Sequence, residues 1–276
     1  MHPTLLVTPW FSVHSYGVFL ALAFLIGAAF MARGLARQGL DVSVVPLVLL
    51  VGVGTGLFGG RLFSALDHPD FLARPAATFF LRAGLAYLGG FLCATLAIAF
   101  VLRRHAVPFV SAADAVAPGL AFGYASARVG CLLAGDGCYG APTLWSWGMQ
   151  FPQGLAPTLA SNGALRARFE ALFPGTPVPD VIAVHPTPIY EALIAIAIGI
   201  VLLRLGREAR PPGLPFATSM ALMGTERFLI EFVRLNPSLA FGLSQAQLIS
   251  LGLLACSLCV HLFHALPPRS LAGARS

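Results

Sequence analysis

The sequence has little charge. Charged residues make up 10% of its 276 positions, hydrophobic residues make up 57%, and the mean hydropathy is +0.82. A soluble domain carries about 25% charged residues because its surface faces water. This shortage of charge excludes an ordinary soluble globular protein, and the long apolar runs exclude a disordered chain. The composition therefore indicates an integral membrane protein.

Lysine is absent. All 17 basic residues are Arg, and the 11 acidic residues leave a formal net charge of +6. In a membrane protein such a basic excess reports on topology and on anionic lipid. The chain also lacks a basic tract interleaved with aromatic residues, the pattern typical of nucleic-acid binding. We therefore expect membrane lipid, and no nucleic acid, among its partners.

Long apolar runs are what the sequence does have. A helix crosses the hydrocarbon core with about 20 apolar residues, and seven segments qualify, at approximately residues 16–35, 44–66, 84–102, 110–134, 187–205, 214–234 and 244–264. We predict an all-α polytopic membrane protein with seven transmembrane helices, a single membrane domain over residues 1–276. Gly52, Gly56 and Gly60 recur at intervals of four and predict close packing of the second span against another helix.

The distribution of Arg outside the spans predicts the orientation of the chain. Four Arg lie on one side: Arg74, Arg82, Arg166 and Arg168. Nine lie on the other: Arg33, Arg37, Arg103, Arg104, Arg204, Arg207, Arg210, Arg269 and Arg275. We expect the C-terminus in the cytoplasm and the N-terminus outside. The connection at residues 135–186 is long and rich in Pro, Gly and aromatic residues, which predicts a small external subdomain between spans four and five.

Several charged residues fall inside the predicted spans, where they are costly and usually face a partner or a cavity. They are Arg61, Arg128, Glu191, Glu226, Arg227, Glu231 and Arg234. With the predicted orientation, these charges converge on the outer leaflet. One interpretation is a set of structural ion pairs between helices. The other is an anion site, because Arg donates in a bidentate fork to phosphate and stays charged, and the obvious anion there is a phospholipid headgroup. Arg would outnumber acid in such a site, with Glu191 and Glu231 holding the Arg side chains.

Three motifs match one family. They are ARVGCLLAGDGCYGAPT at 127–143, HPTPIYEAL at 185–193 and ERFLIEFVR at 226–234, with weaker matches around Tyr16, Arg61 and residues 84–90. In order and spacing, over the whole chain, the sequence resembles the bacterial prolipoprotein diacylglyceryl transferases.

The resemblance implies an enzyme of the bacterial cytoplasmic (inner) membrane, with its external side in the periplasm. The family moves the diacylglyceryl group of phosphatidylglycerol onto the thiol of a lipobox cysteine in a prolipoprotein signal peptide, and glycerol phosphate leaves. By similarity, Arg128 and Arg227 would bind the lipid phosphate and stabilise the leaving group. The other residues expected to take part in catalysis are Tyr16, Tyr87 and His185. The residues expected to bind substrate are Arg61, Cys131, Asp136, Gly140, Tyr190, Glu191, Glu231 and Arg234. The resemblance implies no metal and no organic cofactor.

The chain departs from the family pattern at the expected proton acceptor. The family has a His before the double Gly of the third-span motif, where this chain has Leu88, which cannot accept a proton. Tyr87 is a weak base, since the pKa of an ordinary Tyr is about 10. His185 is another candidate, although a His before Pro at a helix start can also act as a cap or brace. This departure leaves two alternative functions open. The protein could be a paralogue that transfers a lipid-derived group to another acceptor molecule, or a non-catalytic membrane protein that binds anionic lipid or lipoprotein. A transporter is a weaker alternative. Transporters usually show internal repeats and charges at the membrane midplane, whereas the charges here are predicted to lie toward the outside.

Five cysteines are present. Cys256 and Cys259 form a C-x-x-C inside an apolar run, which is typical of packed small side chains. Cys131 stands where the family signature has Asn, and Cys138 lies two residues after Asp136, which stands where the family has Glu. Both cysteines are expected on the outer side of the membrane, which is an oxidising environment. A disulfide, a packed pair of thiols, and a thiol activated by Arg128 all remain open for this pair.

Overall fold

The computed structural model describes all residues except 72, 81–83, 85, 207–209 and 267–276. The chain forms two compact units, Met1–Gly27 with Ala117–Ser276, and Ala28–Val116. Helices α1 (Ser15–Arg37) and α5 (Phe109–Ala134) run from one unit into the other. Each unit is described by itself.

Six helices are long and apolar enough to cross a membrane within the described part of the chain. They are α1, α2 (Val45–Leu66), α4 (Tyr87–Arg104), α5, α7 (Thr187–Leu205) and α9 (Gln245–Ala265). Their ends agree with six of the seven predicted spans to within three residues. The remaining span, predicted at 214–234, corresponds to α8 (Leu214–Ile230), which has 17 residues. The structure is thus that of a polytopic helical membrane protein.

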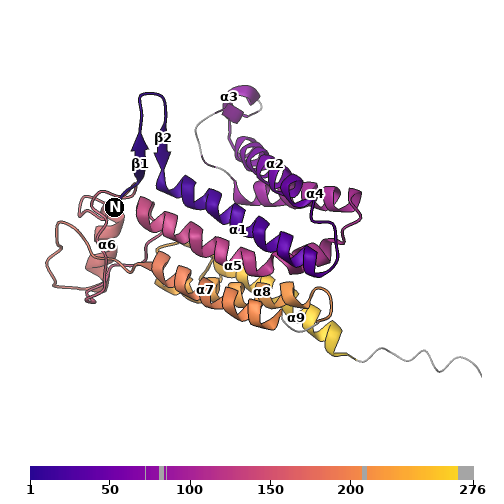
Figure 1. Ribbon diagram of the computed structural model, residues 1–276. Coiled ribbons are helices and arrows are strands. Elements are labelled where there is room, and N and C mark those ends of the chain that lie inside the picture. The colour runs from indigo at the N-terminus through magenta and orange to yellow at the C-terminus, as the bar shows by residue number, and fades with distance from the viewer. Residues whose placement is uncertain (72, 81–83, 85, 207–209, 267–276) are drawn as a thin grey trace, which may run out of the picture. The chain divides into compact units, whose positions relative to one another are not determined.

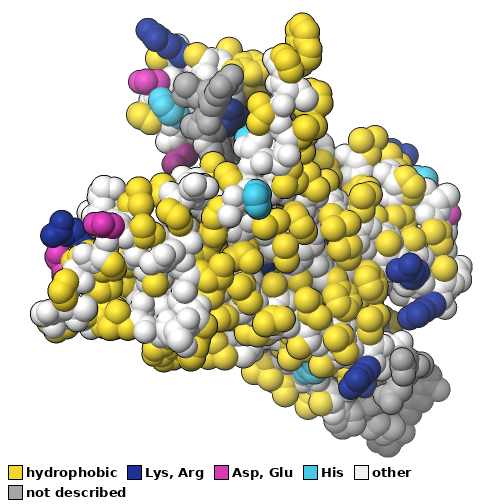
Figure 2. All heavy atoms as spheres, turned by 60° about the vertical axis from the view of Figure 1, so that its left-hand side comes forward, with side chains coloured by type: hydrophobic (Ala, Val, Ile, Leu, Met, Phe, Trp, Pro, Cys, Tyr) yellow, Lys and Arg dark blue, Asp and Glu magenta, His cyan; other side chains and the backbone are white. Residues whose placement is uncertain are grey.

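The surfaces of these helices are apolar. Only 11% of the most hydrophobic window of α1, and 11% of that of α9, is buried within the protein. Figure 2 shows hydrophobic side chains over most of the drawn surface, with charged side chains in small groups. Apolar surface of this extent would be unfavourable in water and fits contact with lipid.

In the unit formed by Ala28–Val116, α2 packs along α4 through glycines (Figure 1). A Cβ built on Gly59 would lie 2.5 Å from Cβ of Cys93, and one on Gly90 would lie 2.8 Å from the carbonyl oxygen of Gly56. Only glycine permits backbones to approach this closely, so the second span packs closely against another helix, as predicted. The glycine that this packing most requires is Gly59, outside the predicted series, because a Cβ on Gly56 would make only an ordinary contact at 3.7 Å. The short helix α3 (Pro75–Phe80) belongs to the same unit.

In the other unit, α8 packs against both α7 and α9 (Figure 1). The local sequence sets the starts of these helices. Gly213 has a φ of +88° and Pro215 follows in the first turn of α8. Ser244 and Gln247 form a capping box at the start of α9, which satisfies backbone N–H groups that the helix leaves unpaired.

The connection at residues 135–186 has an apolar core of its own. The core consists of Tyr139, Phe151, Leu165, Phe169, Ile182 and Val184. Its helix α6 (Gly163–Leu172) begins at Asn162, whose side chain accepts a hydrogen bond from the Leu165 backbone N–H. Isolated β-bridges, among them Pro142 to Val184 and Leu159 to Val181, hold the two ends of the connection together.

Two short antiparallel hairpins add to the predicted all-helical fold. Strands β1 (Thr4–Val7) and β2 (Ser12–His14) precede α1, and strands β3 (Ser238–Ala240) and β4 (Leu243–Ser244) precede α9. The periodicity that identifies spans gives no signal for strands of two to four residues. Gly242, with a φ of +72°, provides the tight turn between β3 and β4.

The end of α8 differs from the predicted span. The α-helix stops at Ile230, Glu231–Val233 form a single 3₁₀ turn (η1), and Arg234 is extended with φ −84° and ψ 167°. Arg234 therefore lies outside the helix, where its backbone forms a β-bridge with Gly140. The hydropathy pattern could not detect this change because Phe232 and Val233 are as apolar as the helix before them.

Candidate active site

The Glu191 carboxylate is the centre of the charged cluster. It lies in the second turn of α7 and is fully buried. Arg128 of α5 forms an ion pair with its Oε2 through Nε, and the Tyr124 hydroxyl donates to the same oxygen at 2.8 Å. Arg234 Nη1 donates to Oε1 at 3.0 Å. The carboxylate thus joins α5, α7 and the segment after α8.

A second carboxylate extends the cluster along α8. Arg227 Nη2 pairs with Glu231 Oε2 at 2.8 Å, across the i,i+4 spacing expected for one helix face. Asn236 Nδ2 donates to Glu231 Oε1 at 2.7 Å, and Arg234 Nε lies 3.8 Å from Oε2. Arg227 Nη1 is 3.9 Å from Glu191 and makes no hydrogen bond within the described residues. This nitrogen is buried, so it is a donor left without a hydrogen-bond acceptor in this part of the chain.

Glu226 is the third carboxylate of the cluster. It is 4% exposed, and neither of its oxygens has a hydrogen-bond partner among the described residues. It is within electrostatic range of Glu191 and of Arg128, Arg227 and Arg234. A buried, unpartnered carboxylate is costly in its charged form.

The charge balance of the cluster depends on Glu226. Three guanidinium groups face three carboxylates, so the cluster is neutral when Glu226 is ionised and carries one positive charge when it is protonated. The sequence led us to expect more Arg than acid, counting Arg61 with this group. Arg61 belongs to the other unit and is not counted here. Within this unit, the net charge of the cluster therefore depends on the state of Glu226.

Gly140 allows three segments to meet beside the cluster. A Cβ at this position would lie 2.6 Å from the carbonyl oxygen of Val233 and 2.8 Å from Cγ2 of Thr187. Its N–H donates to the His185 carbonyl at 2.8 Å. Thr187 Oγ1 and Arg234 Nη1 both donate to the Cys138 carbonyl, at 2.6 and 2.9 Å. Gly140, predicted to bind substrate, therefore also has a packing role that fixes Arg234.

His185 and Tyr190 lie at the N-terminal end of α7, in contact with Trp145 and Trp147. Trp147 Nε1 donates to the Tyr190 hydroxyl at 2.9 Å, and His185 Nδ1 lies 3.4 Å from that hydroxyl. The Trp145 ring packs edge-on against His185. Partial burial lowers the pKa of His185 below its ordinary value of 6.5, which keeps the imidazole neutral and able to accept a proton at neutral pH.

Tyr16, Cys131, Asp136 and Cys138 form a second group beside Arg128. The Arg128 Nη1 atom is 3.6 Å from the Cys138 sulfur and 3.9 Å from the Cys131 sulfur, and both cysteines are free thiols. Tyr16 is within electrostatic range of the two cysteines and of Asp136. A hydrogen bond from the Cys131 thiol, together with nearby Arg128, lowers the pKa of Cys138, whereas burial opposes this. Donor atoms of Cys131, Asp136 and Cys138 lie within 4.8 Å of one another, close enough to share one metal ion.

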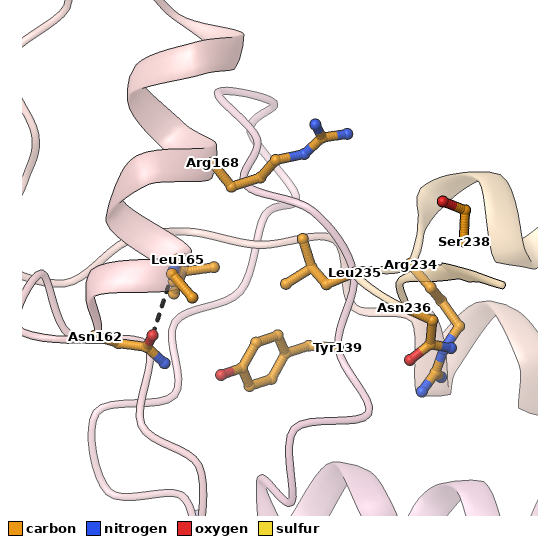
Figure 3. A pocket seen from close by; sticks show the side chains of 9 residues that line it. Tyr139, Asn162, Leu165, Arg168, Arg234, Leu235, Asn236 and Ser238 are labelled. Carbon is orange, nitrogen blue, oxygen red and sulfur yellow. Dashed lines mark hydrogen bonds between the residues drawn. The ribbon is translucent and has the colours of Figure 1, made fainter. Parts of the chain in front are cut away.

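A cavity of about 460 Å³ adjoins the cluster through Arg234. Its lining includes Tyr139, Asn162, Arg168 and Asn236. In Figure 3 the Tyr139 ring points toward Asn162, while Arg234 and Asn236 lie on the opposite side. The volume is in the range of ligand pockets, and the mixture of Arg and amide donors suits a polar, phosphate-bearing group.

Most of the site residues predicted from sequence lie in one unit. Two others, Arg61 and Tyr87, belong to the other unit, where Arg61 donates to the Gly84 carbonyl and Tyr87 is exposed. Sequence reasoning overlooked Tyr124, Trp145, Trp147 and Asn236, and assigned no role to Glu226. Tyr124 stands one helical turn before Arg128, and this i,i+4 spacing was the signal that could have revealed it.

Replacing Glu226 by Gln should leave stability within about 1 kcal/mol of the wild type, because no hydrogen bond is lost. At a pH where Glu226 of the wild type is ionised, it should also increase the thermal stabilisation that added phosphate gives, since the cluster then gains positive charge. Glu191→Gln is the matched control and should cost about 3–5 kcal/mol by breaking buried pairs. Thermal unfolding with and without phosphate measures both. Equal destabilisation by the two variants would contradict the different environments of the carboxylates.

Lowering the pH should destabilise the wild type through His185. Its folded-state pKa lies below the ordinary value of about 6.5, so the unfolded chain takes up the proton first, and the stability contributed by the neutral imidazole is lost as the pH falls below that value. His185→Gln should lose less stability than the wild type between about pH 8 and pH 5. The thermal midpoint across this range is the measurement, with His264→Gln as a control. Parallel curves for wild type and His185→Gln would refute the prediction.

Comparisons with known proteins identify the family of the chain. The family described as prolipoprotein diacylglyceryl transferase matches residues 3–263. A phosphatidylglycerol–prolipoprotein diacylglyceryl transferase of Geobacter sulfurreducens is 31% identical over 250 residues, which is 87% of this chain and 85% of the relative. Similar proteins of the same name are found in Clostridium perfringens (28% identical, covering 95% of this chain and 94% of the relative) and in Xanthomonas campestris (31% identical, covering 89% and 85%). With a match over nearly its whole length, the chain belongs to the prolipoprotein diacylglyceryl transferase family.

Proposed function

We propose that this protein transfers the diacylglyceryl group of phosphatidylglycerol to the thiol of a lipobox cysteine in prolipoproteins. The acceptor sulfur attacks the glyceryl carbon that bears the phosphate, the carbon–oxygen bond breaks, and glycerol phosphate leaves with the electron pair. The observation that carries the proposal is the convergence of three guanidinium groups at the ends of apolar helices, in a chain of this family. The names of its relatives state both substrates.

In this proposal Arg128 and Arg227 bind the phosphate. Their side chains are 15% and 24% exposed, so they are accessible while still shielded from bulk water. Low surrounding dielectric strengthens their interaction with charge that develops on the leaving oxygen. Arg234 is 10% exposed and is held by Glu191 and the Cys138 carbonyl, so its role is to position the site. Tyr16, Tyr190, Glu191 and Glu231 complete the surroundings of the two phosphate-binding residues.

His185 accepts the thiol proton in this proposal. Its neutral imidazole lies next to Tyr190 and on the segment that is hydrogen-bonded to Gly140. Leu88, at the position of the family His, is exposed and has no group that can accept a proton. Arg61 and Tyr87 belong to the second unit, and no step of this proposal depends on them.

Mass spectrometry of a lipobox peptide, incubated with the purified protein and phosphatidylglycerol, tests the activity. We expect a diacylglyceryl mass gain on the cysteine. Arg128→Ala should reduce the rate by about 10²–10³-fold, the effect of removing one donor to developing charge. Arg166→Ala, which removes an exposed pair with Glu170 on α6, is the matched control and should leave the rate unchanged.

Three results would contradict the proposal in different ways. Lipid bound by the folded protein but never consumed would indicate a non-catalytic lipid-binding protein. Lipid consumed without modification of the peptide would indicate another acceptor. An Arg128→Ala rate equal to that of the wild type would remove the phosphate role. If Arg128→Ala fails to fold, Arg227→Lys keeps the charge, removes the planar fork and should still lower the rate.

We also propose seven spans, with α8 as the sixth. Its 17 residues and the 3₁₀ turn after them together cover about 31 Å at the usual rises per residue, close to the hydrocarbon thickness of about 30 Å. An odd number of spans places the two ends of the chain on opposite sides. The Arg distribution then puts the N-terminus and a subdomain at residues 135–186 in the periplasm, and the C-terminus in the cytoplasm.

A single cysteine introduced at Ser161, in a variant without the natural cysteines, tests this topology. Ser161 is exposed in the 135–186 connection. A membrane-impermeant thiol reagent should label it in intact spheroplasts, whereas a cysteine at Arg204 should be labelled only after lysis. The reverse pattern would overturn the orientation.

A further inference from the structure

Three metal-ligating side chains lie together beside Arg128, outside the ion-pair cluster. Cys131 is in the last turn of α5 and is 5% exposed, and Asp136 and Cys138 follow in the next loop. Their donor atoms all lie within 4.8 Å of one another, and no other group of three or more His, Cys, Asp or Glu side chains in the described part of the chain meets this condition. The two sulfurs and one carboxylate oxygen come from a stretch of eight residues.

We propose that Cys131, Asp136 and Cys138 bind one Zn²⁺ ion and leave its fourth position open for the acceptor thiol. This inference rests on the proposed function, which it extends to the activation of the nucleophile. It departs from the metal-free site that the sequence led us to expect.

The donor set favours zinc. Thiolates select Zn²⁺ or Cu⁺ over Mg²⁺ and Ca²⁺, and the added carboxylate oxygen favours the divalent ion. Three protein ligands with a fourth position for water or substrate are typical of catalytic zinc sites, whereas structural sites are closed by four protein ligands. The Asp136 side chain is already oriented, because its Oδ1 accepts a hydrogen bond from the Cys138 backbone N–H at 3.1 Å.

The surroundings of the three ligands balance the charge. Two thiolates, one carboxylate and Zn²⁺ together carry one negative charge, and the Arg128 guanidinium, 3.6 and 3.9 Å from the two sulfurs, compensates it. Hydrogen bonds from such outer groups to the ligands are a regular part of metal sites. Tyr16, which is 40% exposed, is within electrostatic range of all three ligands.

This site would activate the acceptor thiol, a role that Leu88 cannot take because its side chain accepts no proton. A thiol that coordinates zinc loses its proton, and the thiolate is the nucleophilic form of sulfur. The acceptor thiol would give its proton to His185 or to water and bind zinc as a thiolate. Its sulfur would then form the bond to the glyceryl carbon while glycerol phosphate leaves with the electrons of the broken carbon–oxygen bond. Arg128 lies beside both cysteine sulfurs and is the proposed ligand of the phosphate, so the metal-bound sulfur and the lipid phosphate would both lie next to one guanidinium.

Cadmium binding tests the site without using activity. The full-length protein in lipid nanodiscs, reduced and treated with chelator, carries Cys93→Ser, Cys256→Ser and Cys259→Ser so that only the proposed thiols remain. Titration with Cd²⁺ should produce an ultraviolet thiolate-to-metal absorption band that saturates at one ion per chain and is displaced by Zn²⁺. Cys131→Ser or Cys138→Ser in the same background should abolish this saturable band.

Asp136→Asn keeps both thiols and provides a second test if the cysteine variants do not fold. It should weaken the binding of Cd²⁺ and of Zn²⁺ without removing the absorption band. Absence of a saturable band in the three-serine background would overturn the site. So would unchanged affinity in Asp136→Asn, or a disulfide between Cys131 and Cys138 in protein that is active in the peptide assay.

The peptide assay separates this inference from the proposed function. Stripping the metal should abolish transfer to the peptide, and Zn²⁺ should restore it. Transfer that survives complete removal of metal would overturn the zinc role and leave the transferase function in place. Saturable metal binding without any transfer would leave the site in place and overturn the function.

Discussion

Glu191 is a carboxylate with no contact with water, at the end of an apolar helix. Its charge is tolerated only because Arg128, Arg234 and Tyr124 supply it with donors. Removing any one of them leaves a buried charge partly unpaired, which is a large penalty in a protein of ordinary stability. This requirement ties the C-terminal part of α5, the start of α7 and the segment after α8 to one another. The rest of the charged cluster is arranged around that constraint.

Tight backbone contacts make the arrangement possible. The Arg234 guanidinium reaches Glu191 because α8 ends at Ile230 and the chain turns to bridge Gly140. Glycine at 140 permits this approach, since any Cβ would meet the Val233 carbonyl. The same loop carries Asp136 and Cys138, so the packing that fixes the guanidinium also fixes the proposed metal ligands. In the proposed site, binding of the lipid phosphate and activation of the thiol would thus be linked through a few shared residues.

Glu226 gives this site a variable charge. The ion pairs of Glu191 and Glu231 leave one guanidinium charge in excess, and the Glu226 carboxyl either cancels it or, when protonated, does not. Its burial without a hydrogen-bond partner favours the neutral form. When Glu226 is protonated, the cluster carries a net positive charge, which would favour binding of a negatively charged phosphodiester beside the buried Glu191.

The sequence by itself determined the membrane character, the positions of six spans and the residues of the charged cluster. These follow from local rules: an apolar run long enough to cross a bilayer must be a helix, and a charge such as Glu191 or Arg227 within it must have a partner. Only the tertiary structure decided which partners meet. Glu191 takes donors from segments that are up to 67 positions away in the chain, and no spacing rule predicts that choice. The end of α8 at Ile230 likewise depends on packing across Gly140, because close contacts between distant segments leave no periodic signal in the sequence.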